Sequence, residues 1–166
     1  ALYQGALRCA RGTLWGEAGN SLDKSSALIA MLRAAGIPAR YRHGTLNTTQ
    51  AKTLIASLFP AANGVAGYLP IGTALADPVN DATLIALASD QWWVEAYLPG
   101  SGWTDLDPTY PQASAGQSFA TPSNDGTDRA ADVPSGVHHT LRVRLKKEQY
   151  NTFPVGGVTL STTYPL

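Results

Sequence analysis

The sequence predicts an α+β domain, because helical patterns occur early in the chain and strand patterns occur late. In residues 22–35 apolar side chains recur at steps of three and four, the period of a helix with a buried face. In residues 91–98 the pattern is aromatic and alternating, and the turn residues at 99–102 lead into a second extended run at 103–110. We therefore expect a buried N-terminal helix packed on a largely antiparallel β-sheet.

The helix expected at residues 22–35 carries few charges, so most of its circumference should be buried. Gly36 stands just after this helix, where glycine is favoured, and Pro38 forces Ile37 out of helical geometry. The run "ARYRHGTL" at residues 39–46 then continues as an extended segment. The buried helix should thus lead directly into a strand.

Two shorter helices are expected at residues 48–59 and 80–89, since each has polar residues suited to cap its first turn. The candidate caps are Thr48 or Thr49 for the first and Asn80 or Asp81 for the second, and Pro60 is the expected stop of the first. These helices complete the α part of the predicted fold.

The last third of the chain predicts a loop and then strands. Residues 110–136 are rich in Pro, Gly, Ser, Asp and Ala without periodicity, which indicates a long loop or a wrap-around segment. Strict alternation predicts a strand at 138–150, and a weaker strand follows near 155–164. We expect one domain over residues 1–166, with a core at 13–110, a loop at 111–136 and C-terminal strands at 137–163. Its first residue, Ala1, and its extended ending suggest a fragment of a larger protein with flanking domains.

Composition limits the classes of partner. The 166 residues are 44% hydrophobic, enough for one core, and 12 Lys and Arg balance 12 Asp and Glu. This zero formal net charge gives no electrostatic case for nucleic acid, and no apolar stretch approaches the ~20 residues that cross a bilayer. A peptide, a protein or a glycan is the expected ligand. Cys9 is the only cysteine, which excludes an intrachain disulfide and a zinc site with several cysteine ligands.

No cofactor or metal is expected. The runs "DPVND" at 77–81 and "NDGTD" at 124–128 gather oxygen ligands, but neither has the spacing of a calcium-binding loop. Ordinary turn chemistry explains both runs. A glycine-rich phosphate loop and a zinc-ligand spacing are also missing from the sequence.

Three motifs in order carry a family resemblance: "LRAAGIPARY" at 32–41, "WVEAYLPGSGW" at 93–103 and "LDPT" at 106–109. With these motifs the chain resembles the transglutaminase-like superfamily. The resemblance implies a papain-like core, in which the buried helix begins at a nucleophilic cysteine, a later strand carries a histidine base and its hairpin partner carries an aspartate that orients the base. It also suggests a bacterial protein that is extracellular or part of the cell envelope.

Carried over residue by residue, the resemblance places Ser21 at the cysteine position, Gln91 at the histidine position and Asp107 at the aspartate position. A thiol beside an imidazolium becomes a reactive thiolate, whereas a serine hydroxyl needs a general base. Gln91 is no base, because its amide neither gains nor loses a proton near neutral pH. We therefore expect a catalytically degenerate domain that acts as a binding or structural module, with the Gln91 amide hydrogen-bonded to Asp107.

Two alternatives keep catalysis open. The first is an active acyltransferase or peptide hydrolase in which Ser21 is the nucleophile and a rearranged histidine, His43, His138 or His139, is the base. The second is that Ser21 is an engineered replacement for the cysteine of an active enzyme. Gln91 argues against engineering, because one inactivating change would have been enough.

Several of these residues also have structural interpretations. Ser21 is suited to cap the buried helix, and Asp23 suits the positive end of the helix dipole. Trp15 is assigned either to core packing or to donating its indole N–H to a developing oxyanion. Trp92 should face the opposite side of its strand from the scaffold residue Trp93, which makes Trp92 a candidate stacking platform for a sugar or peptide.

Overall fold

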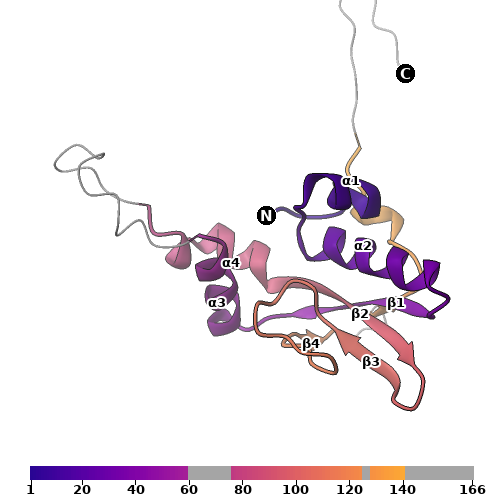
Figure 1. Ribbon diagram of the computed structural model, residues 1–166. Helices are drawn as coiled ribbons and strands as arrows, with labels where there is room; N and C mark the ends of the chain where they lie inside the picture. The colour runs from indigo at the N-terminus through magenta and orange to yellow at the C-terminus, as the bar shows by residue number, and fades with distance from the viewer. Residues whose placement is uncertain (60–75, 125–127, 141–166) are drawn as a thin grey trace, which may run out of the picture.

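The computed structural model describes residues 1–59, 76–124 and 128–140, and it has the predicted α+β architecture. Helices lie against an antiparallel sheet whose strand order is β3-β2-β1-β4, with the short β5 also paired to β1 (Figure 1). The elements are α1 Cys9–Gly16, α2 Ser21–Ala34, β1 Ala39–Thr45, α3 Thr48–Leu58, η1 Pro78–Asn80, α4 Ala82–Ser89, β2 Asp90–Leu98, β3 Gly102–Leu106, β4 Thr121–Pro122, β5 Arg129–Ala130 and η2 Ser135–Val137.

Helix α2 is the predicted buried helix, and its first turn differs from the prediction in one respect. Asn20 is the N-cap: its backbone is extended, and its side-chain oxygen accepts the Asp23 N–H at 2.9 Å. The prediction that Ser21 caps α2 is wrong, because Ser21 is already the first helical residue. Its hydroxyl is therefore free to bond to a neighbouring element.

The C-terminus of α2 ends as the sequence predicts. Gly36 has a φ of +77°, which glycine adopts without strain, and its N–H donates to the Arg33 carbonyl at 3.0 Å. The Ile37 N–H donates to the Leu32 carbonyl at 2.9 Å, which completes a Schellman motif. The chain then enters β1 directly.

Helix α1 carried no signal in the sequence, because it has no side-chain cap of its own and contains two glycines. Its first N–H groups are satisfied from α2: the Asp23 carboxylate accepts the N–H of Arg8 at 3.1 Å and that of Cys9 at 2.8 Å. The Tyr3 hydroxyl donates to the same carboxylate. Burial, together with this hydrogen bond, raises the pKa of Tyr3 to about 12, so its hydroxyl remains a donor. One buried carboxylate thus joins α1, α2 and the N-terminal residues.

The strand pairing places the two hydrophobic clusters on opposite faces of the sheet. Trp92 and Trp93 point to opposite sides of β2, as predicted. The first cluster, between α2 and the sheet, contains Ala6, Leu22, Ile29, Ala39, Tyr41, Trp92, Val94 and Ala96. The second cluster, between α3, α4 and the sheet, contains Leu46, Ala51, Leu54, Ile55, Ala88, Trp93, Tyr110 and Ala120. Strand β2 is therefore covered on both faces.

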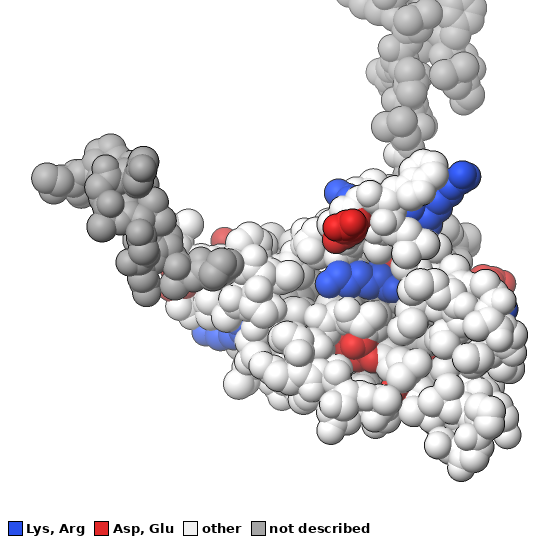
Figure 2. Space-filling view, viewed as in Figure 1, with Lys and Arg blue, Asp and Glu red and all other residues white. Residues whose placement is uncertain are grey.

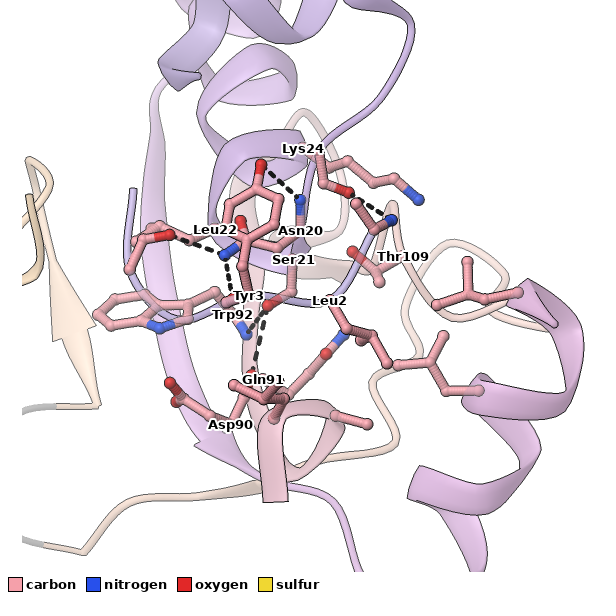
Figure 3. Close-up of a pocket in the computed structure, with 17 residues that line it drawn as sticks. Leu2, Tyr3, Asn20, Ser21, Leu22, Lys24, Asp90, Gln91, Trp92 and Thr109 are labelled. Atoms are coloured by element: carbon pink, nitrogen blue, oxygen red, sulfur yellow. Dashed lines mark hydrogen bonds between the residues drawn. The ribbon is translucent and has the colours of Figure 1, made fainter. Parts of the chain in front are cut away.

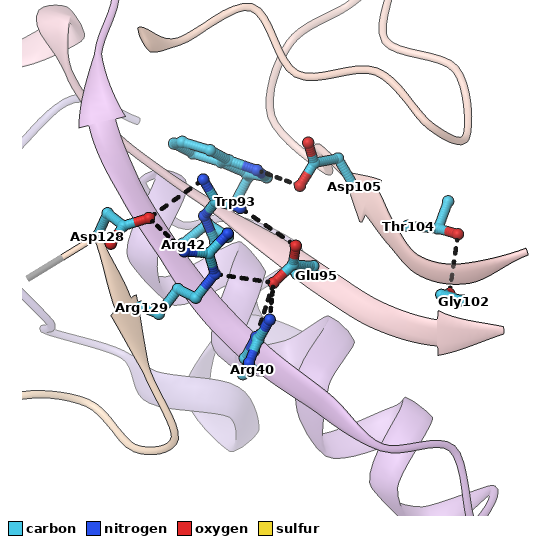
Figure 4. A network of polar contacts seen from close by, with 9 residues as sticks. All are labelled: Arg40, Arg42, Trp93, Glu95, Gly102, Thr104, Asp105, Asp128 and Arg129. Carbon is cyan, nitrogen blue, oxygen red and sulfur yellow. Dashed lines mark hydrogen bonds and ion pairs between the residues drawn. The ribbon is translucent and has the colours of Figure 1, made fainter. Parts of the chain in front are cut away.

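A polar network lies on the same face of β2 as Trp93 (Figure 4). The buried Glu95 carboxylate pairs with Arg40 at 2.6 Å, Arg42 at 3.1 Å and Arg129 at 3.4 Å. Burial raises the pKa of Glu95, but the hydrogen bond and charge of Arg40, with the charges of the other two arginines, outweigh it and hold the pKa below its ordinary value. Arg42 also pairs with Asp128 at 3.2 Å. This network fastens the predicted 110–136 segment to β1 and β2.

The remaining predictions have mixed outcomes. The helices expected at 48–59 and 80–89 are α3 and α4, but Asn47 caps α3 through a capping box with Gln50, so Thr48 and Thr49 were the wrong caps. Asp81 caps α4, as one of its two candidates. The segment 110–136 wraps across the sheet and contributes β4 and β5, which were not predicted. Pro60 and most of the two late strands lie outside the described residues.

The face seen in Figure 2 is mostly uncharged, with a few acidic and basic side chains of both signs spread over it. Within residues 1–59, 76–124 and 128–140, no helix has both the length and the apolar character needed for a membrane crossing.

We predict that Asp23→Ala lowers the free energy of unfolding by about 3 kcal/mol, because it leaves buried N–H groups of α1 without an acceptor. Urea denaturation followed by circular dichroism measures the change. Asp132→Ala is the matched control: this carboxylate is 88% exposed and pairs only with Arg33, so little change is expected. Equal effects of the two substitutions would contradict the structural role of Asp23.

Candidate functional site

Three elements bring the predicted site residues to one region. Ser21 is the first residue of α2, Gln91 is the second residue of β2, and Asp107 directly follows β3. Helix α2 packs on β2, and β3 is the hairpin partner of β2. The three motifs, which are far apart in the sequence, thus meet near the start of α2. Figure 3 shows two of the residues, Ser21 and Gln91, side by side.

Ser21 is buried, and both hydrogen bonds of its hydroxyl join α2 to β2. Its Oγ accepts the Trp92 N–H at 3.2 Å and donates to the Asp90 carbonyl at 3.4 Å. Both partners are main-chain groups. The three histidines of the chain all lie in the described part, and none of them is hydrogen-bonded to Ser21.

Gln91 is 1% exposed, and its amide is directed at Asp107. Gln91 Nε2 donates to the two carboxylate oxygens at 3.2 and 3.3 Å, so the expected hydrogen bond is present. Oδ1 of Asp107 also accepts the N–H groups of Thr109 at 2.9 Å and Tyr110 at 3.1 Å. Burial raises the pKa of Asp107 above its ordinary value of 3.8, although the Thr109, Tyr110 and Gln91 donors oppose the rise.

A cavity of about 20 Å³ lies beside Ser21 and Gln91, which is room for about one water molecule, and Asp107 is not part of its wall. The N-terminal residues Ala1, Leu2 and Tyr3 form part of its wall. The rest of the wall is formed by Gly5, Gly19, Asn20, Ser21, Leu22, Lys24, Leu54, Leu58, Leu87, Ala88, Asp90, Gln91, Trp92 and Thr109. Figure 3 shows Leu2 and Tyr3 beside Ser21 and Gln91. The first residues of the chain thus form one side of a cavity that leaves little free space beside Ser21.

Trp92 separates this small cavity from a larger one of about 340 Å³. His43 stacks on the Trp92 ring with 4.4 Å between centroids, and Trp92 is a buried member of the first hydrophobic cluster. The structure therefore does not present this ring as an exposed stacking platform. His43 Nε2 is 2.7 Å from Asp90 Oδ1, and Nδ1 is 3.3 Å from Ser123 Oγ. The larger cavity is lined by Gln4, Gly5, His43, Asp90, Trp92, Gly136, Val137, His138 and His139. Sequence reasoning missed this gathering of the histidines, because His43 lies 95 residues before His138 along the chain.

Trp15 does not belong to the site or to the core. Its side chain is 77% exposed on α1, and the Arg11 guanidinium lies 4.6 Å above its ring. The prediction of core packing is wrong, because α1 turns this residue toward solvent. Trp15 is also not among the residues that line the cavity with Ser21, so the geometry does not place its indole N–H as an oxyanion donor there.

The oxygen-rich turn at residues 77–81 has the predicted turn chemistry. Asn80 Nδ2 donates to Asp77 Oδ2 at 2.6 Å, Asn80 Oδ1 accepts from Lys52 at 2.6 Å, and Asp81 caps α4. Part of the second run, 124–128, lies outside the described residues. Among the residues that are described, no group of three or more His, Cys, Asp or Glu is placed to hold a metal ion.

Comparison with known proteins gives one match. The family model described as the transglutaminase-like superfamily matches residues 3–108, which is well over half of the chain and includes Ser21, Gln91 and Asp107. No curated protein and no solved structure gives a significant match to the chain.

We predict that Gln91→Met raises the pKa of Asp107 further. The substitution keeps the buried volume but removes an amide donor that favours the ionised carboxylate. A carboxyl-detected NMR titration of Asp107 measures the shift, with the exposed Gln112→Met as the control. An unchanged or lowered pKa in Gln91→Met would show that the amide does not stabilise the carboxylate.

The raised pKa of Asp107 also predicts a pH dependence of stability. A group whose pKa is higher in the folded state stabilises the fold fully below its unfolded pKa, and this contribution is lost as the pH rises through the folded pKa. Between about pH 3 and pH 7, wild-type protein should therefore lose stability relative to Asp107→Asn, which has no carboxyl group to titrate. Urea midpoints measured across this range test the sign, and a relative gain of wild-type stability would contradict it.

Proposed function

We propose that this chain, which belongs to the transglutaminase-like superfamily, is a catalytically degenerate member that acts as a binding or structural module. The observation that carries the proposal is the hydrogen bond from the Gln91 amide to Asp107. An amide N–H donates to a carboxylate as an imidazole N–H does, but the amide transfers no proton near neutral pH. The arrangement supports a site whose geometry is kept while its proton transfer is lost.

The surroundings of Ser21 support the same proposal. A serine nucleophile needs a base that removes its proton, and the acceptor of the Ser21 hydroxyl is the Asp90 carbonyl, which is not a base. Asp107 already accepts hydrogen bonds from Gln91, Thr109 and Tyr110. The Ser21 hydroxyl, the Gln91 amide N–H and the Asp107 carboxylate thus each have a static partner, which is typical of a network that holds a shape. Among the described residues of the site, the buried Thr109 hydroxyl has no hydrogen-bond partner.

The alternative, an active enzyme with Ser21 as nucleophile, requires a histidine to move. His43 is connected to Ser21 through one residue: its ring contacts the Asp90 carboxylate, and the Asp90 carbonyl accepts the Ser21 hydroxyl hydrogen bond. Both of its ring nitrogens are engaged, with Asp90 and Ser123. Activation would therefore break a 2.7 Å contact before any base reached the hydroxyl.

The proposal is tested by incubating the protein with amine donors, glutamine peptides and peptide substrates. We expect no turnover and no acyl adduct by mass spectrometry, in wild type and in Ser21→Ala alike. Reproducible turnover that disappears in Ser21→Ala would overturn the proposal and favour the serine enzyme.

We further predict that restoring both changed groups restores a reactive thiolate. In a Cys9→Ala background, which removes the only native thiol, Ser21→Cys with Gln91→His should react with iodoacetamide at pH 6 at least about tenfold faster than Ser21→Cys alone, because an adjacent imidazolium lowers the thiol pKa. Alkylation rates by mass spectrometry give the comparison. Equal rates would show that positions 21 and 91 do not face each other as a nucleophile and base pair.

A further inference from the structure

The first five residues of the chain, here called the N-terminal arm, lie against the cavity beside Ser21 and Gln91. Ala1, Leu2 and Tyr3 line this cavity, which has only about 20 Å³ left (Figure 3). Leu2 is half-buried and packs against the second hydrophobic cluster. Apolar residues of α3 and α4, namely Leu54, Leu58, Leu87 and Ala88, also line the cavity. Without the arm this region would be a hollow with one apolar wall and one polar wall.

Asn20 holds the main chain of the arm. Its side-chain Nδ2 donates to the Tyr3 carbonyl at 2.8 Å and to the Gly5 carbonyl at 2.7 Å. The other end of the same amide accepts the Asp23 N–H, which fixes the direction of the amide. These two hydrogen bonds bind the backbone carbonyls of residues two positions apart, so they do not depend on which side chains those residues carry. They are the contacts by which proteins bind extended peptides.

Tyr3 supplies the side-chain anchor of the arm. Its hydroxyl donates to the buried Asp23 carboxylate and accepts the Asn20 N–H at 3.3 Å. In contrast, no main-chain N–H of residues 2–5 donates to a described residue. The Ala1 amino group donates to the Gly19 carbonyl at 3.3 Å, and the His139 ring contacts the Gln4 carbonyl. The arm is therefore held at a few separate points, and it is not a strand of the sheet.

The arm ends at a fixed turn. Gly5 has a φ of +74°, and a Cβ at this position would lie 2.4 Å from the Val137 carbonyl oxygen. The next residue, Ala6, is buried and its N–H donates to that carbonyl at 2.7 Å. Gly5 is thus the point about which the residues before it would have to turn to leave the cavity.

We propose that the hollow beside Ser21 and Gln91 is an acceptor site for an extended peptide in which a leucine is followed by a tyrosine, and that the N-terminal arm occupies this site in cis. This inference rests on the proposed function as a binding module and names its partner class. A partner peptide of this kind displaces the arm, using the Asn20 clamp for its carbonyls, Asp23 for its hydroxyl and the α3 and α4 wall for its leucine.

The first test uses a fluorescein-labelled peptide, Ala-Leu-Tyr-Gln-Gly, in anisotropy titrations. The double variant Leu2→Ala with Tyr3→Ala weakens the contacts of the arm but keeps Asn20, Asp23 and the wall of α3 and α4. It should bind the peptide at least about tenfold more tightly than wild type, because in wild type the arm competes with the peptide for the site. Adding Asn20→Asp should abolish binding, because the carboxylate keeps the cap acceptor but loses both donors. The matched control is Leu7→Ala with Leu14→Ala, two exposed leucines outside the site, which should behave as wild type.

The second test needs no peptide and serves if the double variant does not fold. In the Cys9→Ala and Ser21→Cys background, the new thiol lies under the arm and should react slowly with iodoacetamide. Gly5→Ala should raise this rate at least about tenfold, because a side chain at this φ is strained and meets the Val137 carbonyl. Gly36→Ala is the control: it has a similar φ of +77° but no atom within 4 Å, so the rate should stay low.

Each outcome bears on the inference. Tighter binding in the double variant, its loss with Asn20→Asp and faster alkylation only in Gly5→Ala would support it. A folded double variant that binds no peptide, or equal alkylation rates in Gly5→Ala and Gly36→Ala, would overturn it. The proposed function fails by a different result, turnover that depends on Ser21, so the two failures are distinguishable.

Discussion

The Asp23 carboxylate is the contact on which the arrangement around the site depends. It is completely buried and accepts hydrogen bonds from Tyr3, Arg8 and Cys9, which belong to two segments that precede α2. Burying this carboxylate without such donors would lower the stability of the fold by several kcal/mol. The stable packing is therefore the one in which these donors converge on Asp23. Because Asp23 sits in the first turn of α2, the same contact fixes where the helix begins. Ser21, two residues earlier, is thereby placed against β2.

The site is held together by hydrogen bonds that do not depend on proton transfer. The geometry of a proton-transfer site requires a donor to the buried carboxylate, and the Gln91 amide supplies one to Asp107 without titrating. Without that donor the buried Asp107 carboxylate would keep only the N–H groups of Thr109 and Tyr110 as partners. A polar group at position 91 therefore stabilises the carboxylate whether or not it transfers a proton. This explains why an amide, rather than an apolar residue, is compatible with the fold.

Local patterns predicted the elements that are defined by local chemistry. The α2 period, Gly36 and the β2–β3 hairpin were all readable, because each depends on residues close in sequence. Helix α1 was not readable, since its cap is Asp23, fourteen residues after its first N–H donor. The strands β4 and β5 are two residues long, too short for a period. The cap of α2 was ambiguous in the sequence, because Asn20 and Ser21 are adjacent and both are favoured N-cap types.

The two main-chain hydrogen bonds of the Ser21 hydroxyl couple position 21 to position 91 through the fold. A cysteine at position 21 would offer only a weak sulfur acceptor to the Trp92 N–H. A histidine at position 91 would replace the amide that donates to Asp107. A change at either position alone thus disturbs a hydrogen bond of the site, and only a change at both supplies a thiol together with an imidazole. The start of α2 and the start of β2 therefore behave as one unit toward substitution.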